Sequence, residues 1–326
     1  MKNQSYTFCV APLMDGTDRH CRYFHRLLSK RARLYSEMIT ADAVINGNRE
    51  YLLGFDPSEH PVALQLGGSD PKKLRKASMI GAECGYDEIN LNVGCPSDRV
   101  QAGAFGACLM KTPELVADCV SEMIDAVDIP VTVKCRIGVD DQDPEQSLFD
   151  FVEKVSNSGC KVFIVHARKA WLKGLSPKEN RTVPPLDYDL VRKLRRERTD
   201  LQIILNGGIE TIADAAALST EFDGVMLGRA PYGSPYFLAS VDELLFGEEC
   251  DAPTREEVVL LMSEYLKRQF VNGVKPNSIT RHMLGLYRGA PGARVWRRYI
   301  SQNVSAGRDD ILDKALAAVT AERAAA

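Results

Sequence analysis

Residues 201–230 read LQIILNGGIETIADAAALSTEFDGVMLGRA and contain two units of the pattern that decides the fold. The apolar runs 201–208 and 224–230 have the length of strands, and both contain glycine where the run ends. The segment 211–219 between them has helical periodicity. Strands that alternate with helices in this way are typical of an α/β protein with a parallel sheet.

The same alternation extends towards the N-terminus. Six further strand-like runs lie at 7–14, 34–39, 61–68, 88–94, 131–138 and 161–168. Helical patterns at 71–83, 113–127, 144–159 and 187–198 fill most of the remaining gaps, and the first two begin with proline, as helices often do. Eight such units predict a (β/α)₈ TIM barrel, whose usual length is about 250 residues. A doubly wound open sheet is the alternative, but no G-x-G-x-x-G follows the first run.

The composition changes after Gly247. No strand-like run occurs in 254–323, while 255–270 and 309–324 have helical periodicity. We therefore predict a TIM barrel at 1–247 followed by a small all-α C-terminal domain at 248–326.

Charge is distributed unevenly along the chain. The formal net charge is −3, yet residues 265–308 contain nine lysines and arginines and no acidic residue. This asymmetry indicates a surface that faces a polyanion, although a solvated helical surface without acids gives the same pattern. No window approaches the ~20 apolar residues that span a bilayer, so we expect a cytoplasmic protein without membrane contact.

Cysteine and histidine spacing gives no metal signature. The nine cysteines include no CxxC pair, and the five histidines form no HxH or HxxxH pair. We expect no metal and thiols that stay reduced. Nothing in the sequence implies an oligomer, and we expect a monomer.

Six of the predicted strands end in polar or glycine-rich residues. Barrel enzymes carry their chemistry at these ends, so the convergence predicts an active site at the barrel mouth, although each residue alone also fits a satisfied interior position. The glycine-rich ends of the last two strands, with Arg229, suit a phosphate group. The polar strand ends contain Gln65, Asn92 with Cys95, Lys134 with Arg136, His166 with Arg168, Asn206 to Gly208, and Gly228 with Arg229.

Cys95 is the most specific candidate. It follows a strand end, precedes Pro96, and is followed by the glycine- and alanine-rich segment 102–107. A thiol placed there is able to exchange a proton or attack a carbon. The other cysteines fit buried structural thiols.

These motifs together resemble the flavin-dependent tRNA-dihydrouridine synthases over nearly the whole chain. The markers, in order, are APLMDGTD (11–18), QLGG (65–68), NVGCP (92–96), VKCRIG (133–138), VHAR (165–168), NGGI (206–209) and GRAPYG (228–233). The stretches 174–189 and 281–298 are similar to the subgroup called dihydrouridine synthase A.

The resemblance implies a tRNA partner, bound FMN that reduces a D-loop uridine near positions 20 and 20a, and NADPH as the reductant that recharges the flavin. Cys95 would be the general acid that protonates uracil C5. The implied flavin contacts are Pro12, Leu13, Met14, Gln65 and Lys134, with His166 against the flavin or the target base. The implied phosphate contacts are Asn206, Gly207, Gly208, Gly228 and Arg229. For the uracil or the tRNA, we expect contacts from Asn92, Arg136, Arg168, Arg181, Arg294, Arg297 and Arg298.

Two other functions remain open from the sequence. A flavin barrel that acts on a free pyrimidine or small enone explains the barrel and the cysteine but not the basic C-terminal segment. An RNA-binding protein with an inactive barrel explains that segment but not the complete NVGCP motif with Lys134 and His166.

Overall fold

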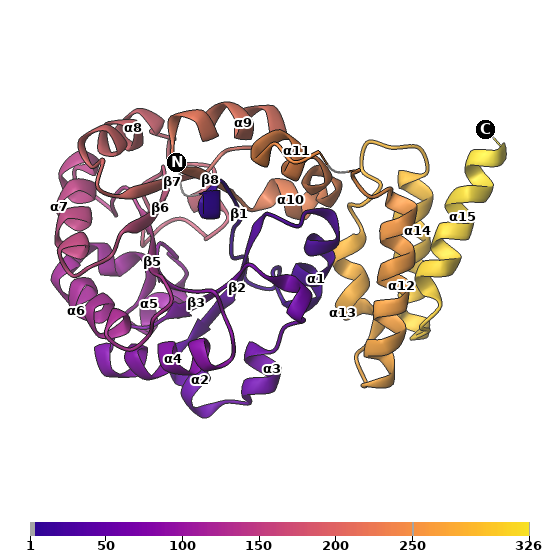
Figure 1. Cartoon of the computed structure of the whole chain (residues 1–326), viewed down its shortest axis with the longest axis horizontal. Helices are drawn as coiled ribbons and strands as arrows, with labels where there is room; N and C mark the ends of the chain where they lie inside the picture. The colour runs from indigo at the N-terminus through magenta and orange to yellow at the C-terminus, as the bar shows by residue number, and fades with distance from the viewer. Residues whose placement is uncertain (1–3, 250, 326) are drawn as a thin grey trace.

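The computed structural model describes residues 4–249 and 251–325 and consists of a closed barrel with a group of helices beside it (Figure 1). Each strand pairs in parallel with the next, and β8 closes the barrel against β1. The predicted TIM barrel is therefore confirmed, and the open sheet is excluded. The strands are β1 (Phe8–Val10), β2 (Arg33–Thr40), β3 (Val62–Gly67), β4 (Glu88–Val93), β5 (Val131–Arg136), β6 (Val162–His166), β7 (Gln202–Asn206) and β8 (Gly224–Leu227).

Helices surround this barrel, and those predicted from periodicity occur where expected. Asp70 and Asp143 cap two of them by accepting a hydrogen bond from the backbone N–H three residues later, and proline follows each cap. The barrel helices are α1 (Arg19–Leu28), α2 (Ala41–Asn46), α3 (Arg49–Leu53), α4 (Pro71–Glu83), α5 (Asp98–Ala102), α6 (Pro113–Ile124), α7 (Pro144–Asn157), α8 (Tyr188–Glu197), α9 (Ile212–Glu221), α10 (Arg229–Gly233) and α11 (Val241–Phe246).

Several strands are shorter than the apolar runs that predicted them. The run 7–14 contains only the three-residue β1, and residues 11–14 form a loop above the barrel. Pro12 has no N–H to donate to a ladder, which favours this early end. The glycines at 207–208 and 228 likewise lie beyond β7 and β8. These residues are thereby released to line the barrel mouth.

The barrel interior contains both apolar and polar buried residues, with an ion pair near its N-terminal end. Cys9, Tyr35, Ile204 and Met226 are among the fully buried residues inside the strands. Below them, Arg33 and Glu88 form an ion pair with an N–O distance of 3.2 Å. Isolated charges are rarely buried, and here each charge is neutralised by the other.

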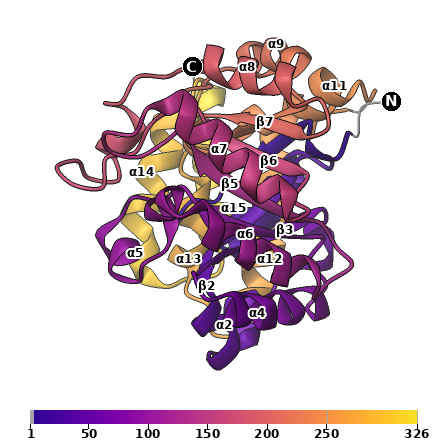
Figure 2. The ribbon, with the colours of Figure 1, turned by 90° about the vertical axis from the view of Figure 1, so that its left-hand side faces the viewer.

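Four helices follow the barrel: α12 (Arg255–Val271), α13 (Pro276–Thr280), α14 (Ala293–Asn303) and α15 (Ile311–Ala325). They lie together on one side of the barrel and behind it in Figure 2, which confirms a helical C-terminal region. The indole of Trp296 is fully buried among them and donates from Nε1 to the Met283 carbonyl at 2.8 Å. The division of the chain at 247/248 stays a prediction.

Three further properties concern the described residues. No helix among them is long and apolar enough to cross a bilayer. Within residues 4–249 and 251–325, no three His, Cys, Asp or Glu side chains gather as a metal site requires. The eight described cysteines are free thiols, and Cys250 lies outside the described residues.

Candidate active site

A pocket of about 510 Å³ opens at the C-terminal ends of the strands, within the size range of small-molecule sites. All of the predicted cofactor residues line it, together with the candidate acid and three of the predicted substrate residues. The residues that were predicted from the sequence and line the pocket are Pro12, Leu13, Met14, Gln65, Asn92, Cys95, Lys134, Arg136, His166, Arg181, Asn206, Gly207, Gly208, Gly228 and Arg229.

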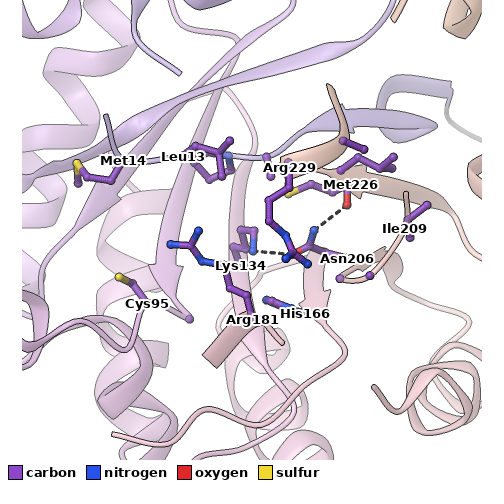
Figure 3. A pocket seen from close by; sticks show the side chains of 18 of the residues that line it. Leu13, Met14, Cys95, Lys134, His166, Arg181, Asn206, Ile209, Met226 and Arg229 are labelled. Atoms are coloured by element: carbon purple, nitrogen blue, oxygen red, sulfur yellow. Dashed lines mark hydrogen bonds between the residues drawn. The ribbon is translucent and has the colours of Figure 1, made fainter. Parts of the chain in front are cut away.

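The pocket floor is built by hydrogen bonds between neighbouring strands. Lys134 Nζ, on β5, donates to Asn206 Oδ1 on β7 at 2.9 Å, and Asn206 Nδ2 donates to the Met226 carbonyl on β8 at 2.7 Å (Figure 3). Burial, and then the nearby guanidinium of Arg136, lower the pKa of Lys134 to about 7. An anionic group beside this amine would therefore favour its protonated form.

Amide side chains form a second set of contacts, between β3 and β4. Asn92 Nδ2 donates to Gln65 Oε1 at 2.8 Å, and Gln65 Nε2 donates to Asn90 Oδ1 at 2.7 Å. Asn90 in turn donates to the hydroxyl of Thr132 at 2.7 Å, and this hydroxyl donates to the carboxylate of Glu88. The chain of donors and acceptors continues to the buried ion pair below and fixes the orientation of the Gln65 amide.

The backbone of Cys95 is held from both sides. Its N–H donates to Asn92 Oδ1 at 3.0 Å, and the N–H of Gly94 donates to the same oxygen at 3.1 Å. Its carbonyl accepts from the N–H of Ala107 at 2.9 Å. The thiol is half-buried, and Sγ lies 3.5 Å from the hydroxyl oxygen of Ser97. The cysteine therefore has a defined position on the pocket wall.

Arg136 hydrogen-bonds to the backbone beside Cys95 and to the loop after β6. Its Nε donates to the Gly94 carbonyl at 3.1 Å, and Nη1 donates to the carbonyls of Asn180 at 2.9 Å and Lys169 at 3.3 Å. The residue is buried, and burial lowers its pKa to about 10, so it remains a cation at neutral pH. Its predicted contact with uracil or RNA stays a prediction.

His166, at the end of β6, lies under the glycine-rich end of β7. Burial, and then the charges of Arg136 and Lys134, hold the pKa of the imidazole well below its usual range, so it is neutral at physiological pH. A Cβ on Gly207 would lie 2.5 Å from His166 Cδ2, and Gly207 has a φ of +110°. Glycine is required here because a side chain would collide with the imidazole.

The rim of the pocket is cationic. Arg181, Arg229 and Arg288 are exposed lining residues, and Glu210 is the lining carboxylate that opposes them. Figure 3 shows Cys95 on one side of the view and Asn206, Ile209 and Arg229 on the other. The glycines at 207–208 and 228 leave space beside Arg229. This donor set suits a phosphate at that corner.

Four predicted RNA contacts lie outside the pocket. Arg168 donates from Nη1 to the carbonyl of Pro184 and is half-buried. Arg294, Arg297 and Arg298 are exposed on α14. Other cations of the basic segment pair with acids from elsewhere, as Lys267 does with Asp313 and Arg308 with Asp310.

Sequence reasoning missed several lining residues. Met38, Met226 and Phe237 supply apolar wall, and Arg288 reaches the pocket from the helical region. Met226 lies two residues before Gly228, and the two-residue period of a strand places such residues on one face. For Arg288 the sequence holds no local signal, because its place depends on how the helices contact the barrel.

A closed parallel barrel with a pocket at its C-terminal mouth is the arrangement of a barrel enzyme, and the cationic rim of this pocket suits an anionic ligand. The sequence model of the family described as "Dihydrouridine synthase (Dus)" matches residues 9–324, so the chain belongs to the dihydrouridine synthase family. This confirms the predicted family and enzyme class, a flavin-dependent oxidoreductase.

Individual relatives agree with this membership. A "tRNA-dihydrouridine(20/20a) synthase" of Vibrio vulnificus is 54% identical over 96% of this chain and 97% of its own length. One of the same description from Escherichia coli is 54% identical over 98% of this chain and 97% of its own length. Among solved structures, Morphinone reductase has a TM-score of 0.53 at 12% identity, covering 77% of this chain and 88% of its own, and shares the fold.

Proposed function

We propose that this protein is a tRNA-dihydrouridine synthase that reduces D-loop uridines at positions 20 and 20a to 5,6-dihydrouridine. The similarity to synthases of that description, over nearly the full length of both chains, carries the proposal.

FMN fits the pocket at its phosphate corner and at its floor. Arg229 and the backbone at 207–208 and 228, which line one corner of the pocket, would hold the phosphate. Lys134 and Gln65 would hydrogen-bond the ring, with Pro12, Leu13 and Met14 against it and His166 beside it. When bound, the flavin would supply a hydride to uracil C6, and NADPH would then reduce the oxidised flavin again.

Cys95 is proposed to supply the proton that uracil C5 then requires. A thiol carries a transferable proton, so it is able to act as a general acid. Asn92 and Ala107 hydrogen-bond to the backbone of Cys95 and fix its position. This supports a role as general acid, because a general acid must be held within reach of its target. Asn92, Arg136 and Arg181 are proposed to face the base or its nucleotide.

The tRNA itself is proposed to bind across the mouth and α14. A paired or stacked uridine must leave its stack to enter a barrel mouth. Arg294, Arg297 and Arg298 have no acidic partner among the ion pairs of the described residues, so their charges are available for phosphates. Arg168 is proposed to extend that surface near the pocket. We further propose a catalytic domain at 1–247, a tRNA-binding domain at 248–326, and a cytoplasmic monomer.

The proposal is tested by mapping dihydrouridine in tRNA from a strain that lacks this gene. Loss of the modification at positions 20 and 20a, restored by the wild-type gene, is the expected result. Unchanged modification at these positions would overturn the proposal. The free-pyrimidine alternative predicts that the purified protein reduces uridine 5′-monophosphate as fast as tRNA.

A further inference from the structure

Asp18 is the point where the helical region meets the loop that follows β1. Arg281 Nη2 donates to Asp18 Oδ2 at 2.6 Å, and His282 Nε2 lies 3.0 Å from Asp18 Oδ1. The same Oδ1 accepts from the N–H groups of His20 and Cys21 and thereby caps α1. One carboxylate thus joins the start of a barrel helix to the helical region.

The loop anchored in this way carries part of the pocket wall. Leu13 and Met14 line the pocket, and the next residue, Asp15, has a φ of +58°. A non-glycine residue in this region is strained and persists only where its surroundings hold it. Arg281 Nη1 donates to the Asp15 carbonyl at 3.0 Å, and the N–H of Gly16 donates to Glu37 at 3.0 Å.

The neighbouring His282 extends the contact to a second loop of the mouth. Its side chain is fully buried, and Nδ1 lies 3.4 Å from the hydroxyl oxygen of Tyr232, with the two rings edge to face at 5.9 Å. Tyr232 lies on α10, three residues after Arg229. Residues 281 and 282 therefore contact both the loop after β1 and the segment that follows β8.

The carboxylate at the centre of these contacts stays ionised. Burial favours the neutral acid, but the contacts with His282, Cys21 and Arg281 outweigh it and hold the pKa of Asp18 well below its usual range. The Asp18 carboxylate is half-buried, and these partners stabilise its charge. Removal of either partner would release the loop that bears Leu13 and Met14.

We propose that Asp18, Arg281 and His282 are positioning residues that fix the two loops over the cofactor pocket, so that the helical region completes this pocket. The inference rests on the proposed function only in taking the ligand to be a flavin. It assigns the helical region a role separate from RNA binding, because residues 281 and 282 contact the barrel and the proposed RNA contacts lie on α14.

The test compares two variants with a matched control. Asp18→Asn keeps an oxygen that caps α1 but removes the charge facing Arg281, and Arg281→Gln removes the other partner. Tyr265→Phe is the control, because it deletes the 2.8 Å hydrogen bond between Tyr265 and His20 at the same junction of barrel and helices without touching either loop.

Binding of FMN to the flavin-free proteins is measured by quenching of flavin fluorescence, with thermal unfolding to verify folding. We expect Asp18→Asn and Arg281→Gln each to weaken FMN binding by about tenfold, the double variant to lose no more than either alone, and the control to be unchanged.

Wild-type affinity in both folded variants would overturn the inference, as would an equal loss in Tyr265→Phe. Failure of the proposed function has a different signature: wild-type protein that binds FMN and yet forms no dihydrouridine.

Discussion

Lys134 and Asn206 join β5 to β7 across the pocket floor through a 2.9 Å hydrogen bond from the amine to the amide oxygen. The amide nitrogen of Asn206 is committed to the Met226 carbonyl, so its oxygen faces the amine. The lysine is therefore held in place by a neutral partner. Its charge remains available to a ligand.

The low pKa of Lys134 couples its protonation both to folding and to ligand binding. The pKa of Lys134 is about 7 in the folded flavin-free protein, whereas the ordinary pKa of a lysine side chain is 10.5. Between these values the unfolded chain binds more protons, so this group makes the unfolding free energy of the flavin-free protein rise with pH.

The reduced flavin ring is anionic at pH 8 and would raise the pKa of Lys134 beside it, so binding of reduced FMN at pH 8 without oxygen should take up a proton. Calorimetry in buffers of different ionisation enthalpy measures this uptake, which should approach one proton for wild type and vanish in Lys134→Met. Equal uptake in both proteins would contradict the prediction.

Arg229→Ala should weaken FMN binding by roughly 10- to 100-fold, because hydrogen bonds to charged groups contribute about 1.5–3 kcal/mol. Equilibrium dialysis followed by flavin absorbance measures the loss. Arg198→Ala serves as the control, since that arginine pairs with Asp200 away from the pocket. Retention of flavin by Arg229→Ala at the wild-type level would place the phosphate elsewhere.

Cys95→Ala should separate the two half-reactions. The variant should bind FMN and accept electrons from NADPH at a near-normal rate, while dihydrouridine formation falls by about 10²- to 10⁴-fold, the usual contribution of a general acid. Stopped-flow absorbance follows each half-reaction. Cys108→Ala, which removes another half-buried thiol near the same loop, should retain activity. A Cys95→Ala protein that fails at flavin reduction would show that the acid assignment is wrong.

The triple variant Arg294→Ala, Arg297→Ala and Arg298→Ala should bind tRNA more weakly. Each lost phosphate contact lowers the salt dependence of binding by about one unit of slope. Filter binding at several salt concentrations measures both quantities, and flavin content should not change.

A control removes the same charge from cations that already have acidic partners. Lys267, Arg308 and Lys314 pair with Asp313 or Asp310, so their alanine triple variant should alter the slope less. Equal effects of the two triple variants would mean that α14 is not the specific RNA surface.

Local pattern was sufficient to predict the barrel, since runs such as 201–208 and helices such as 71–83 carry their own periodicity and caps. It also located the mouth, because polar residues at strand ends converge in any closed barrel. Side-chain partners were not predictable. Asn92 donates to Gln65 on the neighbouring strand, and Arg288 enters the pocket from the helical region. Both contacts are tertiary, so no local pattern predicts them.

The central claim, reduction of uridine within tRNA, is tested most directly by a single-turnover experiment. Protein with its flavin chemically reduced is mixed without oxygen with unmodified tRNA or with uridine 5′-monophosphate, and flavin absorbance is followed. We predict that tRNA reoxidises the flavin far faster than the free nucleotide does, and that mass spectrometry finds dihydrouridine at positions 20 and 20a. Equal reoxidation by the free nucleotide, or reoxidation by tRNA without dihydrouridine, would contradict the account.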